Sequence, residues 1–596
     1  MTPLALRLLD RSEEHISSQL LLLHHYKDIY RWDQRFKSLS SRGFTGLHGA
    51  ALHGMWKLIA ALLAMKKWDI NAKDSMGLTA LAWAAVGSHD DVVKILLRLK
   101  DVNLNVANTE YGRTLLWWAA KSRNEALVKL LLEREDINPN TADTEYGQAP
   151  LWWAAKNGNQ EIARLLLERG DINPNIADTK YGQTPLLAAV ADGHEGVVWL
   201  LLQRKDLNPN TPDTEYGGTP LRRATEGGND GIVRLLLERE DINPNIPDTK
   251  YGQTPLLVAV VDGHEGAVGL LLQRKDLNPN APDTNYDGTP LRWATGRGYK
   301  RMTRLLLERD DISPNTPDTE YGQTPLLAAV ADKHEEVVGL LLQRRDLNPN
   351  TPDTKYGRTP LRLAAERGHS VIVKLLLERE DINPNIPDAK QGQTPLLAAA
   401  VSEHEEVVKS LLKLEDINPN IPDTKYGGTP LWWAAGRGDG RIIRLLLERE
   451  DIDPNTPDTQ SGRTPLLAAA AGGHEGVVGL LLKRRDLNLN TPDTINGGTL
   501  SWAAERGYSG TVRLLLKRED INPNTPSTKF GRTPLRGAVG FGHEVAIGTR
   551  RYQPQYSRHQ KWPNATLGGG GGWTRGSSGV VITAEGSQSQ HSGHQI

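Results

Sequence analysis

The sequence contains no cysteine, and its 596 residues include only four phenylalanines and five methionines. The absence of cysteine excludes disulfide bonds, zinc sites with thiolate ligands and a cysteine nucleophile. Long apolar runs are also missing: Leu20–Leu23 is far shorter than the roughly 18 residues that cross a bilayer. Arg7, Asp10 and Glu13 interrupt the apolar residues of the N-terminus, which therefore lacks the form of a secretory signal. We expect a soluble intracellular protein, cytoplasmic or nuclear, that does not contact a membrane.

An excess of either charge is lacking as well. The 71 Lys and Arg residues nearly balance the 72 Asp and Glu residues, so no overall field attracts nucleic acid. The hydrophobic content of 38% is low for a single globule of this length. It is sufficient for a stack of thin repeats, because each repeat buries its apolar face against two neighbours.

Sequence patterns of catalytic and ligand sites are missing too. No glycine-rich loop leads into Lys and Ser or Thr, so we expect no nucleotide site and no other cofactor or small-molecule substrate. His-Glu pairs such as His194-Glu195 lack the second His of a zinc-protease helix, and we interpret them as residues that begin helices. The adjacent His24 and His25 do not converge on one ion. Asn564 begins a glycosylation sequon that no secretory signal accompanies. We expect a protein that is not an enzyme; a catalytic alternative needs a site hidden in residues 1–42 or in the tail.

What the sequence has in abundance is one repeated phrase. Residues 254–265 read Thr-Pro-Leu-Leu-Val-Ala-Val-Val-Asp-Gly-His-Glu, and related phrases restart every 35 residues, as from Thr254 to Thr289. The restarts are Thr114, Ala149, Thr184, Thr219, Thr254, Thr289, Thr324, Thr359, Thr394, Thr429, Thr464 and Thr499, after earlier copies at Thr45 and Thr79. A fixed period of this size indicates stacked supersecondary units.

Each copy predicts two short helices and a loop. Proline loses nothing at the first helical position, and the Thr before it can cap the helix. Val-Val-x-Leu-Leu-Leu has helical spacing, and the Gly before His separates the two helices. Asp-Ile-Asn-Pro-Asn and Pro-Asp-Thr-x-Tyr-Gly are turn sequences that predict a hairpin-like loop between repeats.

Thr-Pro-Leu, the Ala-Ala pair, Gly-His, Val-Val-x-Leu-Leu-Leu and Asp-x-Asn together resemble the ankyrin repeat, whose signature includes Thr-Pro-Leu-His-x-Ala. The resemblance spans residues 43–545, about fifteen repeats, and implies an all-α solenoid of helix-turn-helix units with short hairpin loops. The copies are longer than the usual 33 residues, and the added length lies in the loop. The family His after Thr-Pro-Leu is present only as His48, so we expect its hydrogen bond to be absent from most repeats. Proline is missing at Thr499, where the register is one residue short.

Three segments follow from this pattern. Residues 1–42 do not repeat and predict a helical cap or junction, residues 43–548 form the array, and residues 549–596 form a Gly/Ser-rich tail that we expect to be disordered. From Thr184 on, repeats that read Leu-Leu-(Ala/Val)-Ala alternate with repeats that read Leu-(Arg/Trp)-(Arg/Trp/Leu)-Ala. The duplicated unit was therefore a pair of repeats.

The residue before the Ala-Ala pair forms a candidate binding surface. It is Trp83, Trp118, Trp153, Arg223, Trp293, Trp433 or Trp502 in seven of the repeats, and a smaller apolar residue in the others. Four residues later, on the same helical face, come Arg297, Arg367, Arg437 and Arg506, facing Asp192, Asp262 and Asp332 in intervening repeats. Three Trp-Arg pairs, Trp293 with Arg297, Trp433 with Arg437 and Trp502 with Arg506, are placed for cation–π contact.

Two interpretations of this ladder stay open. Each bulky residue packs over a small one in the next repeat, or the ladder is a concave recognition surface of the kind enriched in binding hot spots. A line of loop tyrosines favours finger packing over partner contact; its members are Tyr111, Tyr146, Tyr181, Tyr216, Tyr251, Tyr321, Tyr356 and Tyr426.

The resemblance implies a scaffold that binds partner proteins along the concave face and the loop fingers. The near-identical sequences of the repeats also resemble the long ankyrin arrays that follow a NACHT-type NTPase in fungal immune-like receptors. This resemblance implies that the chain is the sensor arm of such a receptor and does not hydrolyse nucleotide. The alternative is a passive structural spacer without a defined partner.

Overall fold

The computed structural model describes residues 43–64, 68–494, 497–527 and 531–540. These residues form 29 helices and no strands, as the sequence predicts for an all-α solenoid. The expected helices of residues 1–42, the expected disordered tail at 549–596 and the end of the last repeat lie outside the described residues.

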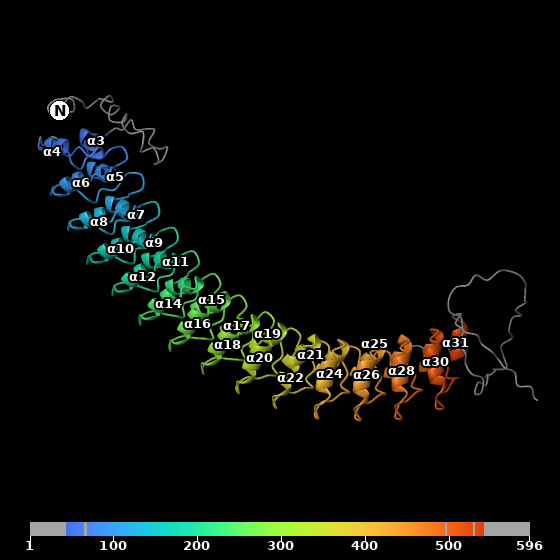
Figure 1. The fold of residues 1–596 in the computed structure, drawn as a ribbon. Coiled ribbons are helices and arrows are strands. Elements are labelled where there is room, and N and C mark those ends of the chain that lie inside the picture. Colours follow the sequence, from blue (N-terminus) through green and yellow to red (C-terminus); the bar gives the residue numbers. More distant parts are fainter. Residues whose placement is uncertain (1–42, 65–67, 495–496, 528–530, 541–596) are drawn as a thin grey trace, which may run out of the picture. The chain divides into compact units, whose positions relative to one another are not determined.

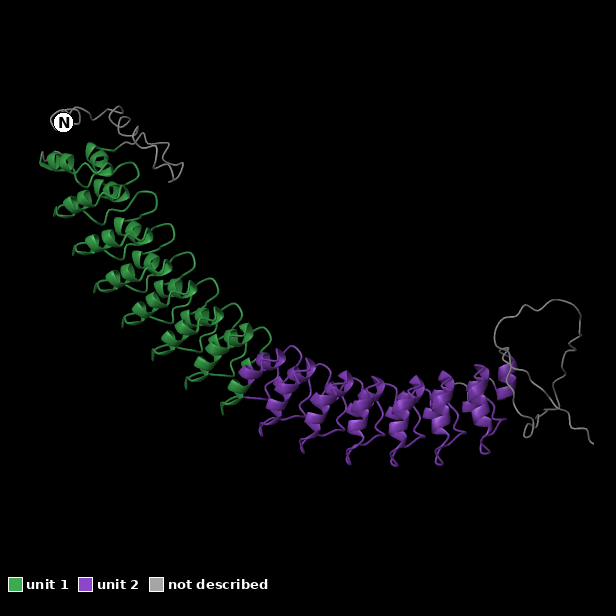
Figure 2. Ribbon diagram, in the orientation of Figure 1, with its two compact units in different colours: residues 1–290, 304–312 green, residues 291–303, 313–596 purple. Residues whose placement is uncertain are grey.

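The chain divides into two compact units (Figure 2). The first comprises Met1–Pro290 with Arg304–Ile312, and the second comprises Leu291–Thr303 with Ser313–Ile596. Each repeat contributes a first helix and a second helix. Within each compact unit, the first helices pack on one another in chain order and form one row, and the second helices form another row beside it (Figure 1).

In the first compact unit the first helices are α3 (Gly46–Leu52), α5 (Ala80–Val86), α7 (Leu115–Lys121), α9 (Pro150–Lys156), α11 (Pro185–Ala191), α13 (Pro220–Glu226) and α15 (Pro255–Asp262). The second helices are α4 (Trp56–Ala64), α6 (Asp90–Leu97), α8 (Glu125–Leu132), α10 (Gln160–Leu167), α12 (Glu195–Leu202), α14 (Asp230–Leu237) and α16 (Glu265–Leu272).

In the second compact unit the first helices are α17 (Pro290–Gly296), α19 (Pro325–Ala331), α21 (Pro360–Arg367), α23 (Pro395–Val401), α25 (Pro430–Arg437), α27 (Pro465–Gly472), α29 (Thr499–Glu505) and α31 (Pro534–Gly540). The second helices are α20 (Glu335–Leu342), α22 (Ser370–Leu377), α24 (Glu405–Leu411), α26 (Gly440–Leu447), α28 (Glu475–Leu481) and α30 (Ser509–Leu516). Helix α18 (Lys300–Leu307) is divided between the two compact units, and the first residue of α17, Pro290, belongs to the first unit.

The helix boundaries follow the predicted capping chemistry. The Thr184 hydroxyl accepts the Leu187 N–H at 3.3 Å, and the proline after the cap occupies the first helical turn. Gly263 ends α15 with φ of 85°, a left-handed conformation that a side chain disfavours. His194 is the cap residue directly before α12, and its ring Nε2 lies 3.1 Å from the Lys156 carbonyl of the preceding repeat. The interpretation of the His-Glu pairs as helix-start residues is therefore confirmed.

One predicted start is wrong by a residue. The cap of α29 is Gly498, and Thr499 is the first helical residue, in the place that proline holds elsewhere. Gly498 adopts the same extended backbone (φ −78°, ψ 164°) as the cap Thr429 (φ −76°, ψ 165°). The finger before it is one residue shorter, so the cap moves back while the apolar helix face keeps its register.

Neighbouring repeats are joined by hydrogen bonds that recur along each compact unit. Asn175 illustrates an asparagine ladder: its Nδ2 donates to the Asp206 carbonyl and its Oδ1 accepts the Asn208 N–H, both at 2.8 Å. Arg204 reaches back to the Leu167 carbonyl at 3.0 Å and also pairs with Asp206 at 2.9 Å. The bond from Arg204 satisfies the carbonyl of Leu167, the last residue of α10, which has no partner inside its own helix.

Candidate functional site

The loop before the first helix of each repeat ends in a tight hairpin, which we call the finger of that repeat. The backbone of each finger folds around one residue, an aspartate in most repeats. Asp178 accepts backbone N–H bonds from Lys180 at 2.9 Å, Tyr181 at 2.6 Å and Gln183 at 3.0 Å. We call its counterparts the finger aspartates; all are buried, and they are Asp74, Asp143, Asp178, Asp213, Asp248, Asp283, Asp318, Asp353, Asp388, Asp423, Asp458 and Asp493. The third repeat has Asn108 in this place. A buried carboxylate is costly unless it is paired and hydrogen-bonded, so its remaining partners matter.

Side-chain donors reach the finger aspartates by two routes. In one, the residue after Thr-Pro-Leu reaches forward to the finger of the following repeat, as Arg222 does to Asp248 at 3.0 Å. Arg292, Arg362 and Trp117 make the same contact with Asp318, Asp388 and Asp143 at 2.8, 2.9 and 3.2 Å. In the other route, the next residue along the helix reaches its own finger. Trp83, Arg223, Trp433 and Trp502 contact Asp74, Asp213, Asp423 and Asp493 at 2.8, 2.9, 2.7 and 2.7 Å.

These two routes give the alternation of repeats a physical reason. Arg222 and Arg223 are adjacent in one repeat, and they supply the following finger and their own finger respectively. The intervening repeats carry Leu and then Ala or Val at the same two places, and these residues have no side-chain donor. Elsewhere an arginine before the cap threonine takes over, as Arg358 does for Asp353 at 2.9 Å and Arg463 does for Asp493 at 3.3 Å.

In the Arg repeats another side chain replaces the link that the family histidine makes in the first repeat. His48 Nε2 lies 3.0 Å from the Ala72 carbonyl and 3.2 Å from the Leu78 carbonyl of the next finger. Arg222 and Arg362 reach the corresponding finger from the same position, so a different side chain makes the equivalent link. Sequence inspection missed this because the acceptor lies 26 residues away along the chain.

The predicted ladder residues lie in different environments. Trp83 and Trp502 are 4% and 6% exposed, so they belong to the core and present little surface. Trp118, Trp153, Trp293 and Trp433 are half-buried, as is Arg223, which is held by Asp213. Arg297, Arg367, Arg437 and Arg506 are exposed.

The predicted cation–π contacts are confirmed. The guanidinium carbons of Arg297, Arg437 and Arg506 lie 5.6, 5.8 and 5.3 Å from the ring centroids of Trp293, Trp433 and Trp502. The charges across repeats pair differently from the expected Arg-Asp alternation. Asp192 pairs with Lys156 at 2.8 Å, and Arg437 approaches Glu403 at 3.7 Å. The small residues between the tryptophans, such as Ala188 and Ala328, are fully covered, as the packing interpretation requires.

The third and fourth repeats hold the densest aromatic group of the first helices, which we call the Lys121 cluster; it comprises Arg113, Trp117, Trp118, Lys121 and Trp153. Trp117 packs edge-on against Trp118 and Trp153, with centroids 5.2 and 5.5 Å apart. Lys121 Nζ lies 4.8, 5.9 and 4.5 Å from the centroids of Trp117, Trp118 and Trp153. Burial and the neighbouring Arg113 charge lower the pKa of Lys121.

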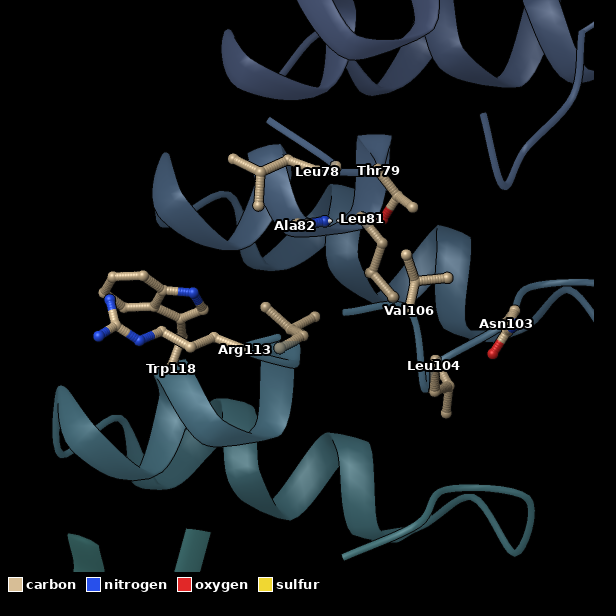
Figure 3. A pocket seen from close by; sticks show the side chains of 11 residues that line it. Leu78, Thr79, Leu81, Ala82, Asn103, Leu104, Val106, Arg113 and Trp118 are labelled. Atoms are coloured by element: carbon tan, nitrogen blue, oxygen red, sulfur yellow. Dashed lines mark hydrogen bonds between the residues drawn. The ribbon is translucent and has the colours of Figure 1, made fainter. Parts of the chain in front are cut away.

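A small hollow adjoins this cluster between α5 and α7. Figure 3 shows Arg113 and Trp118 at one side of it and Leu78, Ala82 and Val106 at others. Its volume of about 20 Å³ has room for one water molecule and not for a cofactor.

The finger tyrosines make contacts within the array. Lys180 Nζ lies 5.7 Å from the Tyr146 ring and 4.6 Å from the Tyr181 ring, so one lysine bridges the fingers of neighbouring repeats. Lys250 bridges Tyr216 and Tyr251 in the same way at 4.6 and 4.8 Å. These contacts support the interpretation of the tyrosines as finger packing.

Within the described residues, no three His, Asp or Glu side chains gather as metal ligands would. None of the described helices has the length and apolar character of a membrane span.

The family comparison agrees with the repeat architecture. The sequence model for ankyrin repeats (3 copies) matches residues 47–143, 137–213, 205–283, 275–353, 346–423 and 414–493. Among solved structures, the ankyrin repeat domain of Bcl-3, a unique member of the IkappaB protein family, is 28% identical; it covers 39% of this chain and 100% of its own, with a TM-score of 0.34. EF0377, an ankyrin repeat protein, is 26% identical and covers 33% of this chain and 97% of its own, with a TM-score of 0.30. No curated protein sequence matches this chain.

Proposed function

Because the chain belongs to the ankyrin-repeat family, we propose that it is a non-catalytic scaffold that binds partner proteins through the first-helix ladder and the loop fingers. Ankyrin repeats are generally protein–protein interaction modules. The proposed contact residues are the exposed arginines Arg297, Arg367, Arg437 and Arg506, the half-buried Trp118, Trp153, Trp293 and Trp433, and the rim residue Arg223. Trp83 and Trp502 support this surface from the core.

The observation that carries the proposal is the arrangement of arginine over tryptophan in the second compact unit. Arg297 and Arg437 are exposed, and each lies over a half-buried indole of its own helix. Arginine and tryptophan are the residue types most enriched in interface hot spots, because each offers a large contact area together with directional polar groups. Stacking on the indole also holds the guanidinium in place, which reduces the entropy lost when a partner binds.

A passive spacer is the second candidate function, and the finger aspartates favour it in part. Trp433 donates to Asp423 and Arg223 pairs with Asp213, so these ladder residues stabilise the fold without any partner. The exposed arginines discriminate the two candidates. Arg367 and Arg437 make no contact with a finger aspartate in the described part of the chain; their contacts are exposed ones with the preceding repeat, Arg367 with the Ala331 carbonyl and Arg437 with Glu403 at 3.7 Å, so their loss should cost a spacer little.

The finer form of the proposal is a cytoplasmic sensor arm of a fungal NACHT-type receptor. The near-identity of the repeat sequences is the one observation that supports it. A reading frame encoding a phosphate-binding loop next to this one in the genome would support it, and a locus without such a frame would favour a free-standing scaffold.

The test is quantitative affinity capture from native extract with charge-matched variants. One variant combines Arg297→Ser, Arg367→Ser and Arg437→Ser on the first helices. The control combines Lys374→Ser, Lys409→Ser and Arg444→Ser, which removes the same charge from exposed positions of the second helices.

We expect captured proteins to be lost at least tenfold from the first variant and to stay with the control, since truncating a hot spot costs about 2 kcal/mol or more. Equal capture by both variants, with unchanged circular dichroism, would place recognition elsewhere. Specific capture by neither variant nor wild type would support the spacer.

A further inference from the structure

The Lys121 ammonium has no anionic partner among the residues that the structure describes. Its ammonium lies among three indoles and makes no hydrogen bond or ion pair with any described residue. The nearest carboxylates are engaged: Asp143 accepts the Trp117 indole N–H at 3.2 Å, and Glu145 pairs with Arg113 at 2.7 Å. The lowered pKa of Lys121 is consistent with this, because burial and Arg113 both disfavour its charge.

The next repeat offers an internal comparison. Lys156 occupies the position of Lys121 one repeat later, and its Nζ pairs with Asp192 at 2.8 Å. Lys121 therefore differs from its counterpart in lacking the carboxylate, although both lysines end the same sequence, Leu-Trp-Trp-Ala-Ala-Lys, on a first helix.

Trp153, which forms one wall around Lys121, is also not held by a hydrogen bond. Trp83, Trp433 and Trp502 at the same position donate to their own finger aspartates. The equivalent acceptor for Trp153 is Asp143, which Trp117 of the preceding repeat already contacts, and the Trp153 indole nitrogen has no partner. No hydrogen bond of its indole therefore fixes the Trp153 ring beside the unpaired ammonium.

We propose that the Lys121 cluster is a docking site for an acidic side chain of a partner protein. The Asp or Glu carboxylate pairs with the Lys121 ammonium, and an apolar neighbour in the same segment lies on the exposed part of the Trp153 ring. Such a segment complements the site in charge and polarity, because its carboxylate meets an ammonium that has no ion pair and its apolar side chain meets the indole rings beside it. The inference rests on the proposed function and assigns a chemical class to the partner of the first compact unit.

A peptide fits this site better than a nucleic acid. Single strands need a row of free cations along the phosphates together with stacking aromatic rings. Here Arg113 of the cluster is paired with Glu145 and the nearby Lys156 is paired with Asp192, which leaves Lys121 as the one cation of the cluster without an ion pair to a described residue. One carboxylate neutralises the Lys121 ammonium. A chain of phosphates would in addition be repelled by the carboxylates of Glu145 and Asp192.

The test is calorimetric titration of the full chain with two blocked pentapeptides. The probe is acetyl-Asp-Glu-Phe-Asp-Glu-amide, and its neutral twin is acetyl-Asn-Gln-Phe-Asn-Gln-amide. The variants are Lys121→Met, which keeps the aliphatic stem, Lys121→Arg, which keeps the charge, and Lys156→Met as the control at the paired counterpart.

We expect the acidic probe to bind at least about tenfold more weakly to Lys121→Met than to wild type, as the loss of a charge-assisted hydrogen bond implies. Lys121→Arg and Lys156→Met should stay within about threefold of wild type, and the neutral twin should bind at least about tenfold more weakly than the acidic probe. Equal binding by the two peptides, unchanged binding by Lys121→Met, or no heat at millimolar probe would overturn the inference. Tighter Lys121-dependent binding of a twelve-residue oligothymidylate would overturn it in favour of nucleic acid.

The two proposals fail separately. If the chain captures partners through Arg297, Arg367 and Arg437 but does not bind the acidic probe, this inference alone is refuted. A chain that binds the probe through Lys121 but captures no protein refutes the proposed function alone.

Discussion

Replacing Arg362 by leucine tests whether the arginine repeats exist to satisfy the finger aspartates. Arg362 is 4% exposed; its Nη2 contacts Asp388 at 2.9 Å, and its guanidinium also donates to the Gln393 carbonyl at 3.2 Å. Leucine fits the site sterically, because Leu327 and Leu397 hold the same position, fully buried, in the neighbouring repeats. The substitution therefore removes a charge partner without leaving an obvious cavity.

The free-energy cost of Arg362→Leu depends on the hydrogen bonds that the Asp388 carboxylate retains. Breaking a buried pair by removing one partner costs about 3–5 kcal/mol. Two backbone N–H bonds remain, from Lys390 at 3.0 Å and Gln391 at 2.6 Å, so we expect the lower end, about 3 kcal/mol. A local opening made easier by this amount exchanges its amides roughly a hundredfold faster.

The assay is native-state hydrogen exchange, read by mass spectrometry on peptides that span the Asp388 finger. It is chosen because a long array does not unfold as one two-state unit. Arg367→Leu, an exposed substitution on the same helix, is the control and should change exchange by no more than a few-fold.

A second variant tests whether the unpaired charge of Asp388 causes the loss of protection. The third repeat carries Asn108 in place of a finger aspartate, and the repeat before it has Ala82, which has no donor, at the position of Arg362. Adding Asp388→Asn to Arg362→Leu reproduces that combination and should restore most of the protection. If the double variant exchanges as fast as Arg362→Leu alone, or if Arg362→Leu behaves like Arg367→Leu, the pairing account is wrong.

Three further predictions concern stability. Gly368→Ala should lower the free energy of local opening, read by native-state hydrogen exchange, by more than about 1 kcal/mol, because Gly368 has φ of 71° and a Cβ would lie 2.6 Å from a histidine ring of the following repeat. Gly436→Ala, inside a helix with its nearest contact at 3.8 Å, should leave that free energy unchanged or raise it. Asn245→Ala should speed exchange of neighbouring finger amides about tenfold, since its side chain makes two bonds of 2.7 Å to the next repeat. The Arg169 guanidinium lowers the pKa of Asp171, and such pairs recur along the array. The temperature of thermal unfolding should therefore stay constant above about pH 5 and fall below about pH 4, because the carboxylates become protonated and lose their partners. An unfolding temperature that does not change down to about pH 2 would contradict this.

Sequence patterns predicted the helices well because their signals are local. Thr184 and its proline set a helix start within three residues, and the glycine at Gly263 sets an end, so capping and periodicity agree without reference to the rest of the fold. The start at Thr499 was missed because the deletion in its finger moved the cap to a glycine that lacks the expected side chain.

The environment of the ladder could not be predicted in the same way. Trp83 and Trp153 occupy equivalent positions, yet one is buried on a finger aspartate and the other is half-buried without a hydrogen-bond partner. The difference arises from Trp117, a residue of the preceding repeat that contacts the shared acceptor. A competition between side chains from different repeats is visible in three dimensions and not in the period of the sequence.

Hydroxyl-radical footprinting of the full chain bound to a captured partner tests the central claim most directly, that the first helices form the recognition surface. The tryptophans supply matched probes: Trp153, Trp293 and Trp433 lie on first helices, whereas Trp56 and Trp199 lie on second helices and are 47% and 50% exposed. The account predicts that the partner lowers oxidation of one or more first-helix tryptophans and leaves Trp56 and Trp199 unchanged. Protection of Trp56 or Trp199, with the first-helix tryptophans oxidised as in the free chain, would contradict it.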